Sequence, residues 1–266
     1  MNTSLFTIYK IEMIKLIKRK DWLALLALVA ISFMFGAAVL SSGYIGESNQ
    51  SALYWVSTQI FNSSGILITP MIFAFICSRI LASEIEDGSI SLYTTRYRNR
   101  GRMYFAKNLA TISFATITFI IVFIINIAIY YIFVCQNPTI SSGKFLGNNI
   151  WALVIVLGAV YISSFILTTQ FSLFLSAYLK PAPVIGIVFV IVLVFHNTFR
   201  VPYLQNINPW YYLIKLSDDV FSTTNQVVVN YSEKLNLFFA FILLNIIYII
   251  IFNLLAVKKF KGSDLQ

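Results

Sequence analysis

The sequence is poor in charge and in the residue types that perform most catalysis. Asp, Glu, Lys and Arg make up 11% of the 266 residues, whereas a soluble domain has about 25%. One histidine (His196) and two cysteines (Cys77 and Cys135) are too few for a metal cluster or a disulfide framework. Gly143-Lys144 lacks the preceding Gly and the following Ser or Thr of a Walker A motif. We therefore expect the chain to bind no cofactor of its own and to have no catalytic residues.

Long apolar runs are abundant instead. The chain is 59% hydrophobic, with a mean hydropathy of +0.81. Intervals without any charged residue occupy 22–46, 48–78, 108–143, 145–179, 181–199 and 235–257. Each can hold the roughly 20 residues of a spanning helix, and runs this continuous favour helices over barrel strands. The sequence predicts one all-α membrane domain over 1–266, with six transmembrane helices near 22–42, 64–82, 108–134, 150–177, 181–199 and 236–257.

The positive charge indicates orientation rather than nucleic acid. The net charge is +9, but the basic residues flank apolar runs, as the positive-inside rule expects. Of the 19 Lys and Arg, 15 fall in the segments that share a side with the N-terminus, and four (Lys144, Arg200, Lys215, Lys234) fall on the other side. We therefore predict a multi-pass cell-membrane protein in contact with lipid, with both termini cytosolic and no nucleic acid partner.

The N-terminal segment has an amphipathic pattern. At 100° per residue, apolar side chains share one face and Lys10, Lys15 and Lys18 lie on the other; the apolar set is Leu5, Phe6, Tyr9, Met13, Leu16 and Ile17. This pattern predicts an interfacial helix over 4–20, on the cytosolic surface. The alternative is a basic flank that only anchors the first span.

The segment 79–107 is the longest dense stretch of charge in the chain. It holds six of the 19 basic and three of the ten acidic residues, between the predicted spans 2 and 3. Acidic residues, a glycine, an apolar stretch and alternate arginines follow in order, which suits a docking helix: the apolar side chains fill a groove and the charges fix its orientation. The candidate residues are Glu84, Glu86, Asp87, Gly88, Ser89, Leu92, Arg96, Arg98 and Arg100. The alternative is a loop that is basic only because of the positive-inside rule.

Two further segments have alternative explanations. Span 4 carries Ser164, Thr168, Ser172 and Ser176 at a spacing of four, with Tyr161 nearby. This row could face a translocation path or a subunit interface, or it could allow close helix packing within one chain. The external segment 200–235 could contain short helices or a re-entrant hairpin with aromatic residues at headgroup depth, or be an ordinary loop.

The charged segment resembles that of the ABC-2 type transporter permease family. Members have an acidic pair, Gly-Ser/Thr, a Leu-containing stretch, Pro-x-Ser-Arg and a Lys seven residues later. The matching residues here are Glu84, Glu86, Gly88, Ser89, Leu92, Arg100 and Lys107. Tyr97 and Asn99 stand where the family often has Pro and Ser. The six-span layout, the basic interfacial helix and the external segment before span 6 extend the resemblance over nearly the whole chain.

The resemblance implies the membrane half of an ABC exporter in a bacterial plasma membrane. Two permease subunits, identical or related, would enclose the path, and the cytosolic coupling helix between spans 2 and 3 would dock on a separate ABC ATPase subunit, which would bind ATP and Mg. Small permeases of this kind resemble those of peptide or antibiotic export and bacteriocin immunity. One alternative is a non-transporting immunity or sensor protein that sequesters a toxic peptide. Another is a membrane-embedded enzyme, although the spans supply almost no titratable groups for one.

Overall fold

The structure is a computed structural model that describes residues 4–40, 50–65, 67–90, 100–147, 149–218, 220–221 and 230–262. Within these ranges the chain forms helices and no strand, and Gln50 and Ser141 make an isolated bridge. Six helical segments are long and apolar enough to cross a membrane: Asp21–Leu40, Ile68–Glu86, Arg100–Gln136, Ile150–Ser176, Pro181–Thr198 and Tyr231–Phe260. The predicted all-α, six-span membrane protein is confirmed.

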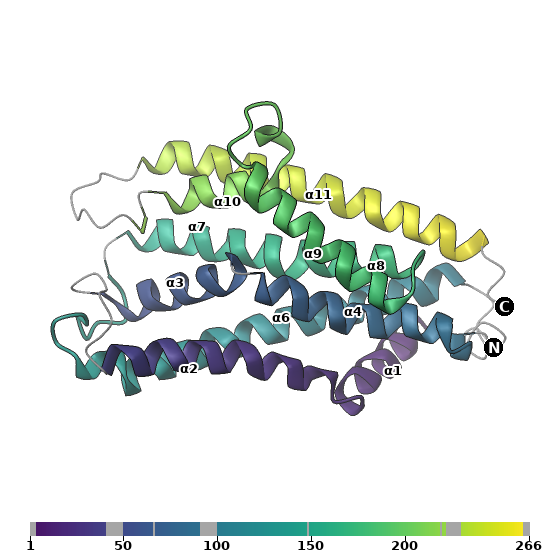
Figure 1. The fold of residues 1–266 in the computed structure, drawn as a ribbon, viewed down its shortest axis with the longest axis horizontal. Helices are drawn as coiled ribbons and strands as arrows, with labels where there is room; N and C mark the ends of the chain where they lie inside the picture. Colours follow the sequence, from purple (N-terminus) through teal and green to yellow (C-terminus); the bar gives the residue numbers. More distant parts are fainter. Residues whose placement is uncertain are drawn as a thin grey trace.

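The helices run side by side along the long axis of the molecule, and α1 lies obliquely across one end (Figure 1). Their bounds are α1 Leu5–Lys18, α2 Leu26–Leu40, α3 Ala52–Gly65, α4 Ile68–Glu86, α6 Arg100–Ile132, α7 Ile150–Val160, α8 Thr168–Ser176, α9 Pro181–Thr198, α10 Pro209–Ser217 and α11 Tyr231–Gly262. We call the end that holds α1, the last turn of α4 and the first turn of α6 the basic end. The opposite end, where α7 and α11 begin, is the far end.

The second and fourth spans form the centre of the bundle. In their most apolar stretches 67% and 61% of the residues are buried, compared with 17–22% for the first, fifth and sixth spans. The fourth span is continuous because a π-helical segment, Tyr161–Leu167, joins α7 to α8. The three peripheral spans therefore present their apolar faces outward, to lipid or to another chain.

An additional helix precedes the second span, where the sequence predicted part of an external connection. Helix α3 packs against α6 and α7, with Leu53, Val56 and Ile60 buried at helical spacing. A break follows at Leu67, whose φ of +68° is left-handed, and α4 continues to Glu86. The Ser, Asn and Gln content of α3 lowers its hydropathy, which explains why the predicted span began only at residue 64.

Two other spans extend beyond their predicted limits. Helix α6 begins at Arg100 instead of 108, because Lys107 is buried among carboxylates and so does not mark a membrane boundary. Helix α11 covers Tyr231–Gly262 around the predicted 236–257. The segment after the fifth span contains a short helix, α10, in agreement with the short-helix alternative. This helix packs on α7, α9 and α11.

Candidate functional site

Three elements meet at the basic end: the middle of α1, the last turns of α4 and the first turns of α6. Five charged side chains meet at this contact, three of them buried and two partly exposed. We call them the ion cluster: Glu12, Lys15, Arg19, Glu84 and Lys107. The cluster lies where the chain leaves the second span and enters the third. It therefore connects the two ends of the segment for which the sequence predicted a coupling helix.

Lys107 is the centre of the ion cluster. Its side chain is fully buried, and its ammonium donates to Glu12 Oε2 at 2.8 Å, Glu84 Oε2 at 2.7 Å and the Ile80 carbonyl at 3.1 Å. These three bonds use all three ammonium hydrogens. Removing one member of such a buried group leaves the other charges uncompensated, which lowers the free energy of unfolding by about 3–5 kcal/mol.

Two further cations cover the carboxylates from the solvent side. Lys15 donates to Glu12 at 2.9 Å and to Glu84 at 3.4 Å. Arg19 donates to Glu84 Oε1 at 2.5 Å and to the Arg79 carbonyl at 2.8 Å. Both side chains are partly exposed, and both carboxylates are almost fully buried. With three cations and two anions the cluster has a formal charge of +1.

The local sequence directs α1 into this position. Ser4 caps its N-terminus by accepting from the Thr7 amide. Glu12 is buried on the same face as Ile8 and Leu16, since positions four apart share a helix face. Phe6 is 70% exposed. The predicted interfacial helix is therefore a helix, but its buried face includes a carboxylate, and part of its predicted apolar face points outward.

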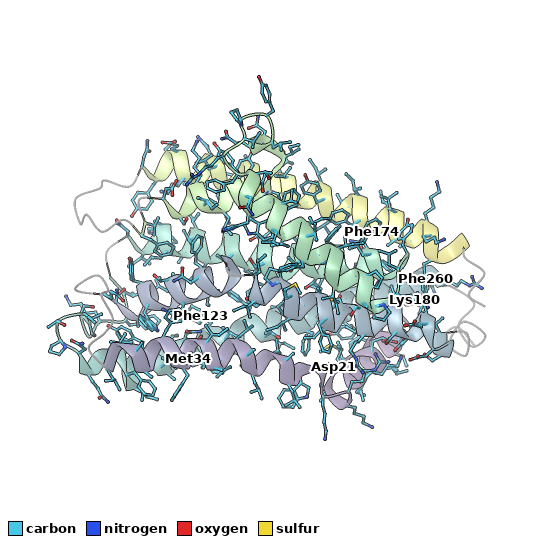
Figure 2. All side chains as sticks on the ribbon, in the orientation of Figure 1. Asp21, Met34, Phe123, Phe174, Lys180 and Phe260 are labelled. Atoms are coloured by element: carbon cyan, nitrogen blue, oxygen red, sulfur yellow. The ribbon has the colours of Figure 1, made fainter. Side chains whose placement is uncertain are left out.

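The chain then turns into the first span and is tied to α4 a second time. Lys20, at a left-handed φ of 58°, separates α1 from the 3₁₀ turn Asp21–Leu25. The Asp21 carboxylate forms an ion pair with the Arg79 guanidinium, with 3.3 Å between Oδ1 and Nε. Figure 2 shows Asp21 and Lys180 toward the basic end, with Met34 in the opposite half. The N-terminal elements are thus fastened to α4 at two points.

The two glutamates of the predicted coupling set lie in different environments. Glu84 points into the ion cluster and is 2% exposed. Glu86 is about half exposed and pairs with the exposed Lys180, at the start of α9, at 3.1 Å. An exposed pair of this kind contributes little to stability. Glu84 is therefore placed to fix helices relative to one another, and Glu86 lies at the surface next to the fifth span.

The turn after α4 directs the chain out of the bundle. The Asp87 amide donates to the Ser83 carbonyl at 2.9 Å, Gly88 has a φ of +67°, and the Ser89 hydroxyl donates to the Glu84 carbonyl at 3.3 Å. Glycine adopts this left-handed conformation without strain. Arg100 is the first residue of α6. Leu92, Arg96 and Arg98 lie outside the described residues, as does most of the predicted coupling helix.

The small polar row of the fourth span lies inside the subunit. Ser164, Thr168, Ser172 and Ser176 are all buried, and the last three hydroxyls donate to carbonyls four residues earlier. Tyr161 hydrogen-bonds to Thr116 on α6 at 2.7 Å. Helix α8 packs against α4. This placement favours the packing alternative for the row over a path-lining one.

Sequence reasoning missed several residues of the site. Glu12 and Lys15 belong to the ion cluster, and a signal for Glu12 existed because it is the only acidic residue among the first 20. A second polar group also joins three spans: Asn108 donates to Gln170 and Asn253, and Asn253 donates to Gln170 at 3.0 Å. No pattern in the sequence indicates that these three residues meet.

Comparison with known proteins identifies a family. A family model described as "ABC-2 family transporter protein" matches residues 8–197. The matched range includes all five residues of the ion cluster and ends within α9. No curated protein matches the chain.

Proposed function

Because this chain belongs to the ABC-2 family of transporter proteins, we propose that it is the permease subunit of an ATP-driven exporter. The chain is a multi-pass membrane component of a transporter. In the proposed assembly two permease subunits, identical or related, enclose the path. A separate cytosolic ABC ATPase binds ATP and Mg, hydrolyses the ATP and supplies the work. The substrate class that we propose is a peptide, an antibiotic or another amphipathic molecule.

The ion cluster is the observation that carries this proposal. Lys107 binds Glu84 across the ends of the charged segment and binds Glu12 on α1. A force applied to residues 87–99 therefore reaches α1, α4 and α6 together. A contact of this kind suits a segment that transmits the movement of an ATPase, because α1, α4 and α6 must then move together as a rigid body.

The composition of the connecting segment supports the same role. Acidic residues and Gly88 precede Ile90 and Leu92, and the arginines follow. Apolar side chains flanked by charges match the usual anatomy of a protein interface, in which an apolar centre provides affinity and a charged rim provides orientation. We propose that Leu92 enters a groove of the ATPase and that Arg96, Arg98 and Arg100 fix its orientation.

The test measures ATPase association and coupling. The chain is purified in mild detergent with its candidate ATPase, as wild type and as the double variant Leu92→Asp, Arg100→Ala. Leu146→Asp is the matched control, because Leu146 is 49% exposed in the 133–149 connection at the far end. We expect the double variant to lose copurification and stimulated ATP hydrolysis, with the control unchanged. Full coupling in the double variant would refute the docking role.

A further inference from the structure

The helix of the fifth span ends part-way along the bundle, and an irregular segment follows it, which we call the interruption. Helix α9 ends at Thr198, and residues 199–208 form a series of turns. Asn208 then caps α10 by accepting from the Trp210 amide at 2.9 Å, with Pro209 in the first turn. Helix α10 continues toward the far end, so that α9, the interruption and α10 together complete one crossing (Figure 1).

Contacts with α11 give the depth of the interruption. Near the far end, the Lys234 ammonium donates to the Asp218 carbonyl at 2.6 Å. About 21 Å further along α11, at 1.5 Å per residue, the Tyr248 hydroxyl donates to the Ile207 carbonyl at 2.7 Å. Lys258 follows about another 15 Å later. Ile207 therefore lies at the level of the apolar middle of the sixth span, away from both headgroup regions.

The interruption is exposed at this depth, and its polar side chains stand beside exposed apolar ones (Val201, Leu204 and Ile207). Asn197, Arg200, Tyr203 and Asn206 are exposed on the outer surface of the subunit, and Tyr203 is 93% accessible. Hydrocarbon offers no partner to irregular backbone, which is tolerated at membrane depth only when protein covers it or when it lines a water-filled cavity. A long arginine side chain can extend toward headgroups, but the backbone of the turns cannot.

Two buried nitrogens beside the interruption favour water. Trp210 Nε1 and His196 Nδ1 are inaccessible at the atomic level, and neither has a hydrogen-bond partner among the described residues. Buried polar atoms are normally satisfied, and ordered water serves those that the chain does not reach. Both residues adjoin the interruption, since the rings of Trp210 and Phe195 stack and Asn208 donates to the Phe195 carbonyl at 2.7 Å.

Arg200 gives this surface its charge. Its guanidinium lies 5.2 Å from the centre of the Phe199 ring, and no carboxylate of the described residues pairs with it. An ionisable residue within a span normally faces a polar interior or a cavity, and it marks a pathway more often than a lipid-facing position.

We infer that residues 196–207 line a water-filled part of the transport path, and that Arg200 there attracts the anionic group of the transported molecule. This inference rests on the proposed function, because it assigns a wall of the path and a charge preference to it. The ligand chemistry is a carboxylate, phosphate or sulfonate carried by an amphipathic molecule. The exposed face of the fifth span is then turned toward the second subunit, with water between them, and away from lipid.

Thiol labelling in membranes tests for the water. In a C77A/C135S background, because Cys135 is exposed, Tyr203→Cys is treated with a membrane-impermeant, sulfonate-bearing thiosulfonate reagent. Leu243→Cys is the matched control, since Leu243 is 62% exposed on continuous helix at nearby depth. We expect rapid labelling at position 203 and none at 243. The inference fails if position 203 reacts no faster than position 243.

The charge preference is measured on the same cysteine. The ratio of labelling rates with sulfonate-bearing and trimethylammonium-bearing reagents is compared in the R200, R200Q and R200K backgrounds. A unit charge about 4 Å away changes a local ion concentration about fivefold even in water. We expect R200Q to lower the anion-to-cation ratio at least about fivefold and R200K to keep it. An unchanged ratio in R200Q would contradict the assigned role of Arg200.

The two proposals fail independently. Labelling needs no ATPase, so an inaccessible position 203 removes the path assignment and leaves the exporter proposal intact. Accessible cysteines, combined with full coupling in the Leu92→Asp, Arg100→Ala variant, contradict the docking role alone.

Discussion

Replacing Lys107 with methionine should destabilise the basic end more than any exposed charge substitution. The change removes three hydrogen bonds and leaves Glu12 and Glu84 buried, with only Lys15 and Arg19 to compensate them. Breaking a buried pair costs about 3–5 kcal/mol. Because Lys15 and Arg19 still compensate the carboxylates in part, we expect the free energy of unfolding to fall by about 3 kcal/mol, the lower limit of this range.

The assay is thermal unfolding in detergent, followed by size-exclusion chromatography. For a chain of this size 1 kcal/mol corresponds to about 2–4 °C, so the expected fall in midpoint is about 6–12 °C. Lys180→Met is the matched control, because its pair with Glu86 is exposed and contributes at most about 1 kcal/mol.

A second variant identifies the cause. Adding Glu84→Gln to Lys107→Met removes one of the uncompensated carboxylates. We expect this double variant to regain part of the lost midpoint temperature of unfolding, which corresponds to a coupling energy of about 1–3 kcal/mol between the two positions. Strictly additive effects of the two substitutions, or a loss in Lys107→Met no larger than in Lys180→Met, would refute the argument that buried charge compensation holds these helices together.

Three other substitutions test separate contacts by the same unfolding assay. Gly36→Ala places a Cβ 2.6 Å from Ile129 Cγ2, and we expect about 1–3 kcal/mol of destabilisation unless α2 and α6 can separate freely. Asn253→Leu removes a partner of Gln170 and should cost about 0.6–2 kcal/mol; a neutral effect would show that the polar group is not structural. Gly88→Ala meets no side chain but must adopt a φ of +67°, so about 1–2 kcal/mol of backbone strain should appear, and an unchanged midpoint would argue against the left-handed turn.

The number and type of the spans follow from sequence because lipid imposes a simple constraint. A spanning helix needs about 20 uncharged residues, and each predicted span falls within or overlaps a helix of the structure. Span 4 was predicted at 150–177 and observed at Ile150–Ser176. Its limits are clear because charged residues or loops flank it on both sides.

Boundaries were poorly predicted where charge or polarity does not coincide with the membrane surface. Lys107 lies inside α6 because two carboxylates neutralise it, and α3 is buried despite its Ser and Gln residues because Trp55 and Val56 pack on neighbouring helices. The interruption after α9 was expected at headgroup depth. Its contact with Tyr248 could be found only from the packing of the fifth and sixth spans.

The ion cluster was outside the reach of sequence analysis because its members are far apart in the chain. Glu84 was predicted as a candidate for coupling from its position in the charged segment, and the structure places it among partners from two other helices. Local periodicity reports on neighbours three or four residues apart. It carries no information about which helix a buried carboxylate will meet.

The position of Lys107 also imposes an order on biosynthesis. Glu12 lies 95 residues before Lys107 and Glu84 lies 23 residues before it, so α1 leaves the ribosome before its central partner exists. At about 5–20 residues per second this interval lasts roughly 5–20 seconds. During that time Glu12 must stay hydrated at the membrane surface, and α1 can dock only after α4 and the start of α6 have been synthesised. Helix α1 is therefore fixed in place only after the second span and the start of the third have been made.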